Sequence, residues 1–159
     1  PVEVAFDRHW DPNEGVRSTT RRMSASDIQA IKTEMAAEFH KVFAEELAKG
    51  GYALVDQVRD DTLRLHAQIA DVFINAPDRM EPGRVTSYTM ESGRATLELE
   101  LRDGATGQLL ARVVDEKTAP RSGTLQVTNS VTNSADFRQA VRSWARRLVK
   151  ELDSLNGKP

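Results

Sequence analysis

Cysteine is absent from this chain of 159 residues. Its absence excludes disulfide bonds, thiolate metal ligands and cysteine nucleophiles within the chain. Long hydrophobic runs are missing as well, since no apolar stretch approaches the roughly 20 residues that a membrane-spanning helix needs. The formal net charge is only −2, so no large excess of one sign draws the whole molecule to nucleic acid or to an anionic membrane.

What is present is the composition of an ordinary globular protein. Hydrophobic residues make up 39% of the chain and charged residues 29%, which is close to the average for such proteins. A chain of this length can bury a core without metal ions or disulfides. We therefore expect a single domain that spans residues 1–159.

The last third of the chain carries the clearest pattern. Between residues 95 and 102, apolar side chains alternate with polar ones, which predicts a strand with one dry face and one wet face. The run Asp103-Gly104-Ala105-Thr106-Gly107 supplies turn residues, with two glycines free to take positive φ. The next strand should therefore fold back antiparallel.

Two amphipathic helices are predicted. The first is capped by Ser26, with Gln29 completing a capping box, and ends at Gly50-Gly51. The second runs from about Ala135 to Leu155 and is capped by Ser134. Their apolar stripes recur every three or four residues and comprise Ile28, Ile31, Met35, Phe39, Val42, Phe43 and Leu47 in the first, and Phe137, Val141, Trp144, Leu148, Leu152 and Leu155 in the second.

The remaining segments complete a β-α-β-β-β-β-β-α order. Further strands are predicted at residues 2–6, 52–58, 63–75 and 85–90. The blurred alternation near 72–74 indicates either a bulge or a strand end that is covered on both sides. Residues 7–23 read as an irregular polar segment, and 120–134, with its repeated VTNS, as a mobile loop. The fold class is α+β: an antiparallel β-sheet with two amphipathic helices packed on one face. The order of the strands stays open.

Histidines and carboxylates give no convincing catalytic pattern. The spacing of His9, His40 and His66 matches no local metal-ligand motif, and His66 lies on the wet side of its strand. The acidic pairs are Asp60-Asp61 in a turn, Glu45-Glu46 on a helix, and Glu98 with Glu100 on the wet face of the hairpin. Solubility and turn propensity explain each of them. We expect no enzyme, with no catalytic residue, cofactor or metal.

A row of cations on the last helix is the sharper candidate site. Residues four apart lie on one side of a helix, and the candidate partner-binding residues are Arg138, Arg142, Arg146, Arg147 and Lys150. Like charges at this spacing repel, so contact with an acidic surface would explain the row. The alternative is a solvated flank whose charges pair with acids of the neighbouring strand.

Two tryptophans complete the set of candidate residues. Trp144 falls on an apolar stripe, so core packing accounts for it. Trp10 lies in the polar N-terminal segment, where it either fastens that segment to the domain or contacts a partner. The pattern leaves both interpretations open.

Three runs carry a family resemblance: LAKGGYALVDQVRDDTLRLHAQIADV, LRDGATGQLLARVVDE and DFRQAVRSWARRLVKELD. Together they resemble a family of uncharacterised bacterial lipoproteins, a domain family of unknown function found mostly in Gram-negative bacteria. The resemblance extends from about Asp27 to Asp153. Its most specific residues are Asp103 with Thr106-Gly107 in the hairpin, and Phe137 with Trp144-Ala145 and Leu148 in the last helix.

The resemblance implies a place in the cell envelope and no particular activity. We expect the periplasmic, soluble part of a lipoprotein that is anchored to the outer membrane through a lipid attached upstream of Pro1, after an export signal. The expected function is a non-enzymatic binding or accessory module of the envelope. Its partner would be an envelope protein, an anionic polymer or a lipid surface, and not nucleic acid. A periplasmic carrier of a small apolar ligand is the alternative.

Overall fold

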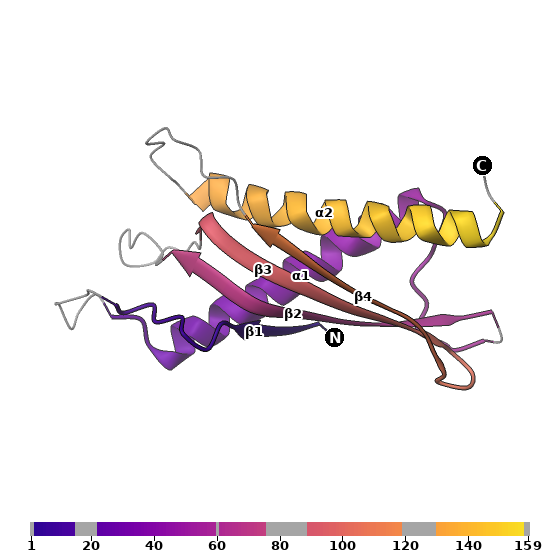
Figure 1. Ribbon diagram of the computed structural model, residues 1–159, viewed down its shortest axis with the longest axis horizontal. Helices are drawn as coiled ribbons and strands as arrows, with labels where there is room; N and C mark the ends of the chain where they lie inside the picture. Colours follow the sequence, from indigo (N-terminus) through magenta and orange to yellow (C-terminus); the bar gives the residue numbers. More distant parts are fainter. Residues whose placement is uncertain (1, 15–21, 60, 76–88, 119–129, 158–159) are drawn as a thin grey trace.

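A four-stranded sheet and two long helices make up the fold, which a computed structural model describes over residues 2–14, 22–59, 61–75, 89–118 and 130–157 (Figure 1). The α+β class expected from the sequence is confirmed. In chain order, the elements are β1 (Glu3–Phe6), α1 (Ala25–Lys49), β2 (Leu63–Asn75), β3 (Thr89–Asp103), β4 (Leu109–Thr118) and α2 (Ser130–Leu155).

The strands lie side by side in the order β1-β2-β3-β4. β3 pairs antiparallel with both β2 and β4, whereas β1 pairs parallel with β2. The expectation of a purely antiparallel sheet is therefore wrong, and the sheet is mixed. The cause is the connection between β1 and β2, because α1 intervenes and carries the chain back to the end of the sheet from which a parallel strand can start.

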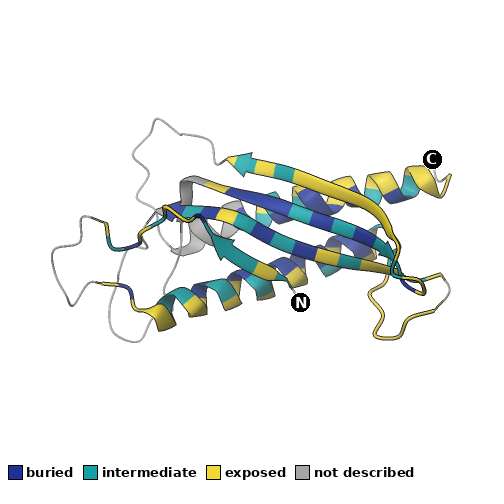
Figure 2. Cartoon of the chain, turned by 60° about the horizontal axis from the view of Figure 1, so that its bottom comes forward, coloured by how far each residue is buried: buried dark blue, intermediate teal, exposed yellow. Residues whose placement is uncertain are grey.

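Both helices cover the same face of the sheet, as predicted. On β3 the buried side chains of Leu97 and Leu99 alternate with the half-buried side chains of Glu98 and Glu100 (Figure 2). The buried residues join α1 and α2 in one hydrophobic core. The opposite face of the sheet carries polar and charged side chains.

The core contains most of the side chains for which the alternation and the helical spacing predict burial, and Ile28 of the first stripe is only partly buried. Confirmed as buried are Phe39, Phe43, Leu97, Leu99, Trp144 and Leu148. Leu155, counted in the same stripe, is 79% exposed, because it is the last residue of α2 and lies beyond the core, whose last member on this helix is Leu152.

The N-cap of α1 lies two residues before the predicted one. Ser24, and not Ser26, is the N-cap: its Oγ accepts a hydrogen bond from the Asp27 N–H at 3.2 Å, and the Asp27 carboxylate accepts one from the Ser24 N–H at 2.8 Å. The capping box is thus Ser24 with Asp27, in place of Ser26 with Gln29. Aspartate is a good acceptor at this position and also favours the positive end of the helix dipole.

α2 begins earlier than predicted. Ser130 to Ser134, assigned from the sequence to a mobile loop, are helical, so Ser134 is not the cap. Serine, threonine and asparagine cost only about 0.5–0.7 kcal/mol each in a helix, and extending an existing helix is easier than starting one. Residues 120–129, the first part of the predicted loop, lie outside the described residues.

Two strand assignments also need correction. Residues 52–58, predicted as a strand, pair with no strand and are mostly exposed. The run is apolar from Tyr52 to Val55 and then mostly polar, with no regular alternation that would mark one face for burial in a sheet. The strand predicted at 85–90 and the hairpin strand predicted at 95–102 are not separate, since β3 runs from Thr89 through Ser92-Gly93 to Asp103. Residues 85–88 of the predicted strand lie outside the described residues.

The hairpin and the bulge agree with the sequence pattern. Gly107 takes a positive φ of 73°, and its N–H donates to the Asp103 carbonyl at 2.9 Å. Gly104 does not take the positive φ that was expected. Glycine fits there because a Cβ would lie 2.4 Å from the carbonyl oxygen of Thr62. The bulge in β2, one of the two alternatives predicted there, is confirmed, with a register shift after Ala70 and a φ of 50° at Asp71.

Candidate functional site

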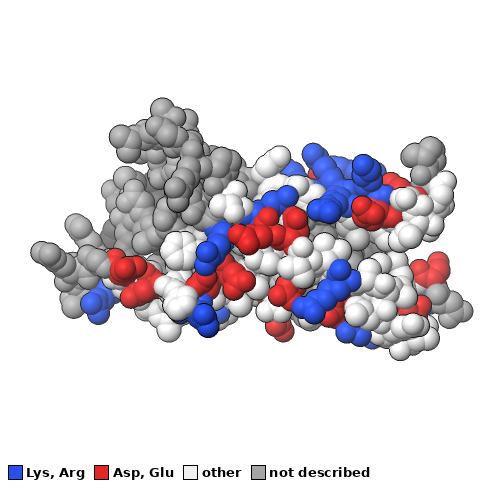
Figure 3. Space-filling model, viewed as in Figure 1, with Lys and Arg blue, Asp and Glu red and all other residues white. Residues whose placement is uncertain are grey.

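The five cations predicted as a site lie on α2 beside its buried stripe. We call Arg138, Arg142, Arg146, Arg147 and Lys150 the basic flank. Buried Val141, Trp144 and Leu148 hold the helix against the core, which leaves the flank facing outward. Figure 3 shows basic side chains gathered along the C-terminal half of α2, with acidic side chains next to them.

Part of the basic flank is paired with α1. Arg146 Nε lies 2.8 Å from Glu46 Oε2, and Arg138 Nε lies 3.6 Å from Glu38 Oε1. Glu46 is also bound by Lys49, whose Nζ lies 2.7 Å from Oε1. The Glu46 side chain is only 5% exposed. Hydrogen bonds from Lys49 and then Arg146 hold the pKa of Glu46 below its usual value.

Another part is paired with β4. Arg147 Nη1 lies 3.5 Å from Asp115 Oδ1, and Lys117 Nζ lies 3.3 Å from Asp115 Oδ2. Trp144 donates a hydrogen bond from Nε1 to the same carboxylate at 2.7 Å. Burial favours the neutral acid, but the Trp144 hydrogen bond and the two cations outweigh it, so the pKa of Asp115 is lowered.

Arg142 and Lys150 differ from the other members of the basic flank. Within the described part of the chain, neither has an ion pair with a carboxylate. Glu46 and Asp115 are each shared by two cations, so they do not neutralise the flank completely. The flank therefore keeps a positive excess, with three members held by carboxylates, Lys150 exposed and Arg142 half-buried.

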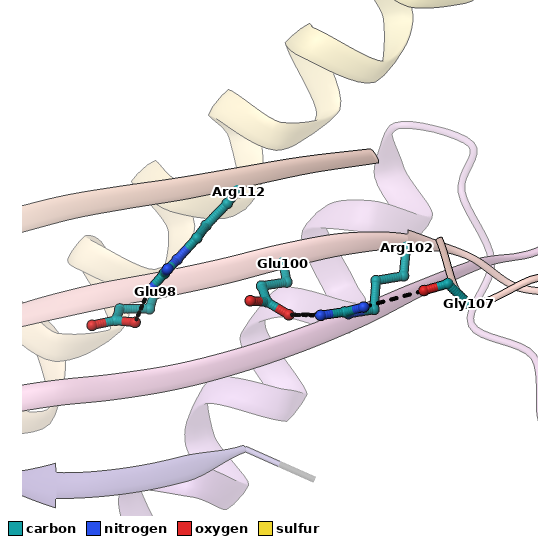
Figure 4. Close-up of polar contacts among 5 residues, drawn as sticks. All are labelled: Glu98, Glu100, Arg102, Gly107 and Arg112. Carbon is teal, nitrogen blue, oxygen red and sulfur yellow. Dashed lines mark hydrogen bonds and ion pairs between the residues drawn. The ribbon is translucent and has the colours of Figure 1, made fainter. Parts of the chain in front are cut away.

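The acidic pair on the hairpin belongs to ion pairs on the open face of the sheet. Glu98 Oε2 lies 2.8 Å from Arg112 Nη2, and Glu100 Oε2 lies 2.8 Å from Arg102 Nη2 (Figure 4). Arg102 also donates to the carbonyl of Gly107 at 3.1 Å, which links the pair to the turn. Each carboxylate has a cationic neighbour, so the two are not poised against each other as a catalytic pair would be.

The three histidines lie on three different segments of the fold. His40 lies exposed on α1, His66 is exposed on β2 opposite Glu100, and His9 accepts a hydrogen bond from Arg8 Nε at 2.9 Å. Within the described ranges, no group of three or more histidine, aspartate or glutamate side chains could hold a metal ion. Neither described helix combines the length and the hydrophobicity that a membrane span requires.

Trp10 fastens the N-terminal segment to the domain. Its ring stacks on Phe6 with a centroid distance of 4.0 Å, and its Nε1 donates to the carbonyl of Ile74 at 2.7 Å. Nearby, Asp7 forms an ion pair with Arg94. Of the two interpretations left open by the sequence, the structure supports the internal contact.

Glu46 is the residue that the sequence pattern missed. The sequence predicts that Glu45-Glu46 is a solvent-exposed acidic pair that aids solubility, and Glu45 is indeed exposed. Glu46, however, follows Val42 by four residues and so falls on the buried stripe of α1. A charged residue at a stripe position, with Lys49 one turn later, is the signal that could have identified it.

The family model of a protein of unknown function (DUF3313) matches residues 11–148. The chain belongs to this family. The matched region contains α1, β2, β3 and β4 and most of α2, including Arg138, Arg142, Arg146 and Arg147; it leaves out β1 and Lys150. Among curated proteins, none matches the chain.

Proposed function

We propose that this domain is a non-enzymatic binding module of the bacterial cell envelope, and that the basic flank is its contact surface for an anionic polymer or lipid headgroup surface. The observation that carries the proposal is the positive excess on one exposed side of α2. Cations gathered on one side of a rigid helix attract an anionic surface over about a Debye length, roughly 10 Å at 0.1 M salt.

The ion pairs beneath the flank support this function by fixing its geometry. Glu46 and Asp115 hold Arg146 and Arg147 against α1 and β4. Arg142 and Lys150 then extend from a helix that cannot rotate without breaking these contacts. A preorganised set of charges loses less conformational entropy on binding than a flexible one.

The envelope location rests on the family resemblance of the sequence. A periplasmic domain, lipid-anchored to the outer membrane through an upstream segment, would work close to anionic headgroups and envelope polymers. The anchor would supply the membrane attachment, and the basic flank would orient the domain. An exposed charge adds roughly 1 kcal/mol or less near such a surface, so the flank would give a weak, salt-sensitive contact.

The test is the binding of the purified chain to vesicles that contain phosphatidylglycerol, and to a polyanionic polysaccharide, at increasing salt. The Arg142→Gln/Lys150→Gln variant should lose at least about tenfold in affinity at low salt, with the melting temperature nearly unchanged, because neither side chain has an ion pair to lose within the described chain. Arg146→Gln is less suitable, since it would disturb buried Glu46.

The matched control is Arg22→Gln/Arg64→Gln, which removes the same charge from exposed positions outside the basic flank. It should bind like the parent chain. Equal losses in the two double variants would assign the effect to net charge alone and overturn the proposed surface. Binding to neutral vesicles as strong as to anionic ones would also contradict the proposal.

A further inference from the structure

β4 is an edge strand with an exposed apolar centre. In the described chain it pairs with β3 on one side and with no strand on the other. Exposed fractions are 51% for Leu110, 39% for Val113 and 59% for Val114. Figure 2 shows β4 almost entirely exposed, next to the buried residues of β3.

An edge of this kind invites a further strand. No other described strand pairs with its outer N–H and C=O groups, which can hydrogen-bond to another chain. Natural edge strands are usually protected by proline, by a short length or by inward-pointing charges. β4 is ten residues long, contains no proline and has two valines at its centre, and the charge of its inward-pointing Asp115 is already compensated by Trp144 and Arg147.

Charge complementarity identifies the partner strand. Two copies of β4 that pair antiparallel keep the same sheet face only when residues of the same alternation oppose each other. With Val114 opposite the partner copy's Val114, Arg112 lies opposite Glu116 on both sides of the twofold axis. Opposite charges directly across a strand pair attract.

The neighbouring registers lack this match. Centring the pair on Val113 sets Arg112 opposite Val114, and Ala111 opposite Asp115. Centring it on Asp115 brings two carboxylates together, which repel. The register centred on Val114 is thus the one that pairs charges of opposite sign and buries the most exposed valine against its own copy.

We propose that the partner of the β4 edge is a second copy of this chain, paired antiparallel about Val114. The sheet then continues across both copies, and the helices of both lie on the same face. Arg112 is accessible for this contact, because its side chain is 54% exposed while it pairs with Glu98 on the open face. The proposal is independent of the basic flank on α2.

Charge exchange tests the register. Sedimentation velocity over a concentration series should show a dimer for the parent chain, with a dissociation constant about tenfold higher for Arg112→Glu and for Glu116→Arg, since each places like charges opposite each other. The double variant Arg112→Glu/Glu116→Arg should restore the dimer. Arg64→Glu, which makes the same charge change on β2, should have no effect.

Cysteine crosslinking tests the axis, and the cysteine-free chain makes each single variant unambiguous. Under mild oxidation, Val114→Cys should form a covalent dimer at least about tenfold faster than Val113→Cys, because directly opposed Cβ atoms lie about 4.5–5.5 Å apart and diagonal ones about 7–8 Å.

Three outcomes would overturn the proposal. The parent chain could remain a monomer at the highest concentration tested, in which case the edge is open to a strand of another protein. The double charge exchange could fail to restore the dimer although both single variants fold. Val113→Cys could crosslink faster than Val114→Cys, which would exclude this register.

Discussion

Trp144 on α2 packs in the hydrophobic core and also contacts a charged residue of β4. Its ring is buried, with 3% of the side chain exposed, and its indole N–H donates to Asp115 on β4 at 2.7 Å. Tryptophan can make both contacts because it is apolar over most of its surface and polar at one atom. Through this side chain the core meets the ion pairs of the basic flank at Asp115.

Replacement of Trp144 by alanine should lower the free energy of unfolding by about 3–5 kcal/mol, because a large buried ring leaves a cavity. Urea unfolding at neutral pH measures the change. Leu155→Ala, on the same helix but at a residue that is 79% exposed, should cost less than about 0.5 kcal/mol. A loss below about 1 kcal/mol for Trp144→Ala would place the ring outside the core.

Glu46 should make stability depend on acid pH. Its pKa is lowered in the fold by Lys49 and Arg146, so its contribution is fully present above the unfolded-state pKa of about 4.3. The contribution is lost as the pH falls through the lower, folded-state pKa. Glu46→Gln should therefore cost about 1 kcal/mol at pH 7, and the difference from the parent should shrink below about pH 4.

Unfolding free energies of the parent and of Glu46→Gln between pH 3 and 7 check this expectation. Glu45→Gln is the control, since Glu45 is the exposed neighbour on the same helix. A difference between the parent and Glu46→Gln that stays constant over this range would show that the charge of Glu46 does not contribute to the fold.

At the scale of elements, the N-cap of α1 shows how accurately a local sequence pattern can predict where a helix begins. Two serines, Ser24 and Ser26, precede the apolar stripe, and each has a polar residue three positions later. Aspartate and glutamine both accept hydrogen bonds, so the pattern alone does not choose between the two boxes. The choice falls on Ser24 because its extended backbone, with φ of −87° and ψ of 167°, ends the preceding segment there.

Ser24→Ala should lower stability by about 1 kcal/mol, because the Asp27 N–H would lose its acceptor at the end of the helix. Ser26→Ala should have an effect of less than about 0.5 kcal/mol. Thermal melts of the two variants side by side distinguish the two capping boxes. Equal destabilisation by both would contradict the assigned N-cap.

The long periodic elements were the predictable part of the fold, and the short or exposed segments were not. The stripes of α1 and α2 and the alternation of β3 follow from burial on one face, so residues such as Phe39 and Leu97 could be assigned correctly. Residues 52–58 were predicted as a strand without such an alternation, and whether a short segment pairs depends on the whole sheet. The basic flank could be predicted from the four-residue spacing of its cations. Its ion pairs with Glu46 and Asp115 could not, because they depend on how α1 and β4 pack against α2.

At the scale of the whole molecule, the parallel pairing of β1 bears on the order in which the fold assembles. β2, β3 and β4 follow one another in sequence as they do in the sheet, whereas β1 reaches β2 only after the whole of α1. The entropy lost in closing a loop increases with its length, and contacts between distant residues slow folding. Loop-closure entropy thus favours a meander that closes first and an N-terminal strand that docks last. Detachment of β1 would then leave the whole β2-β3-β4 meander paired.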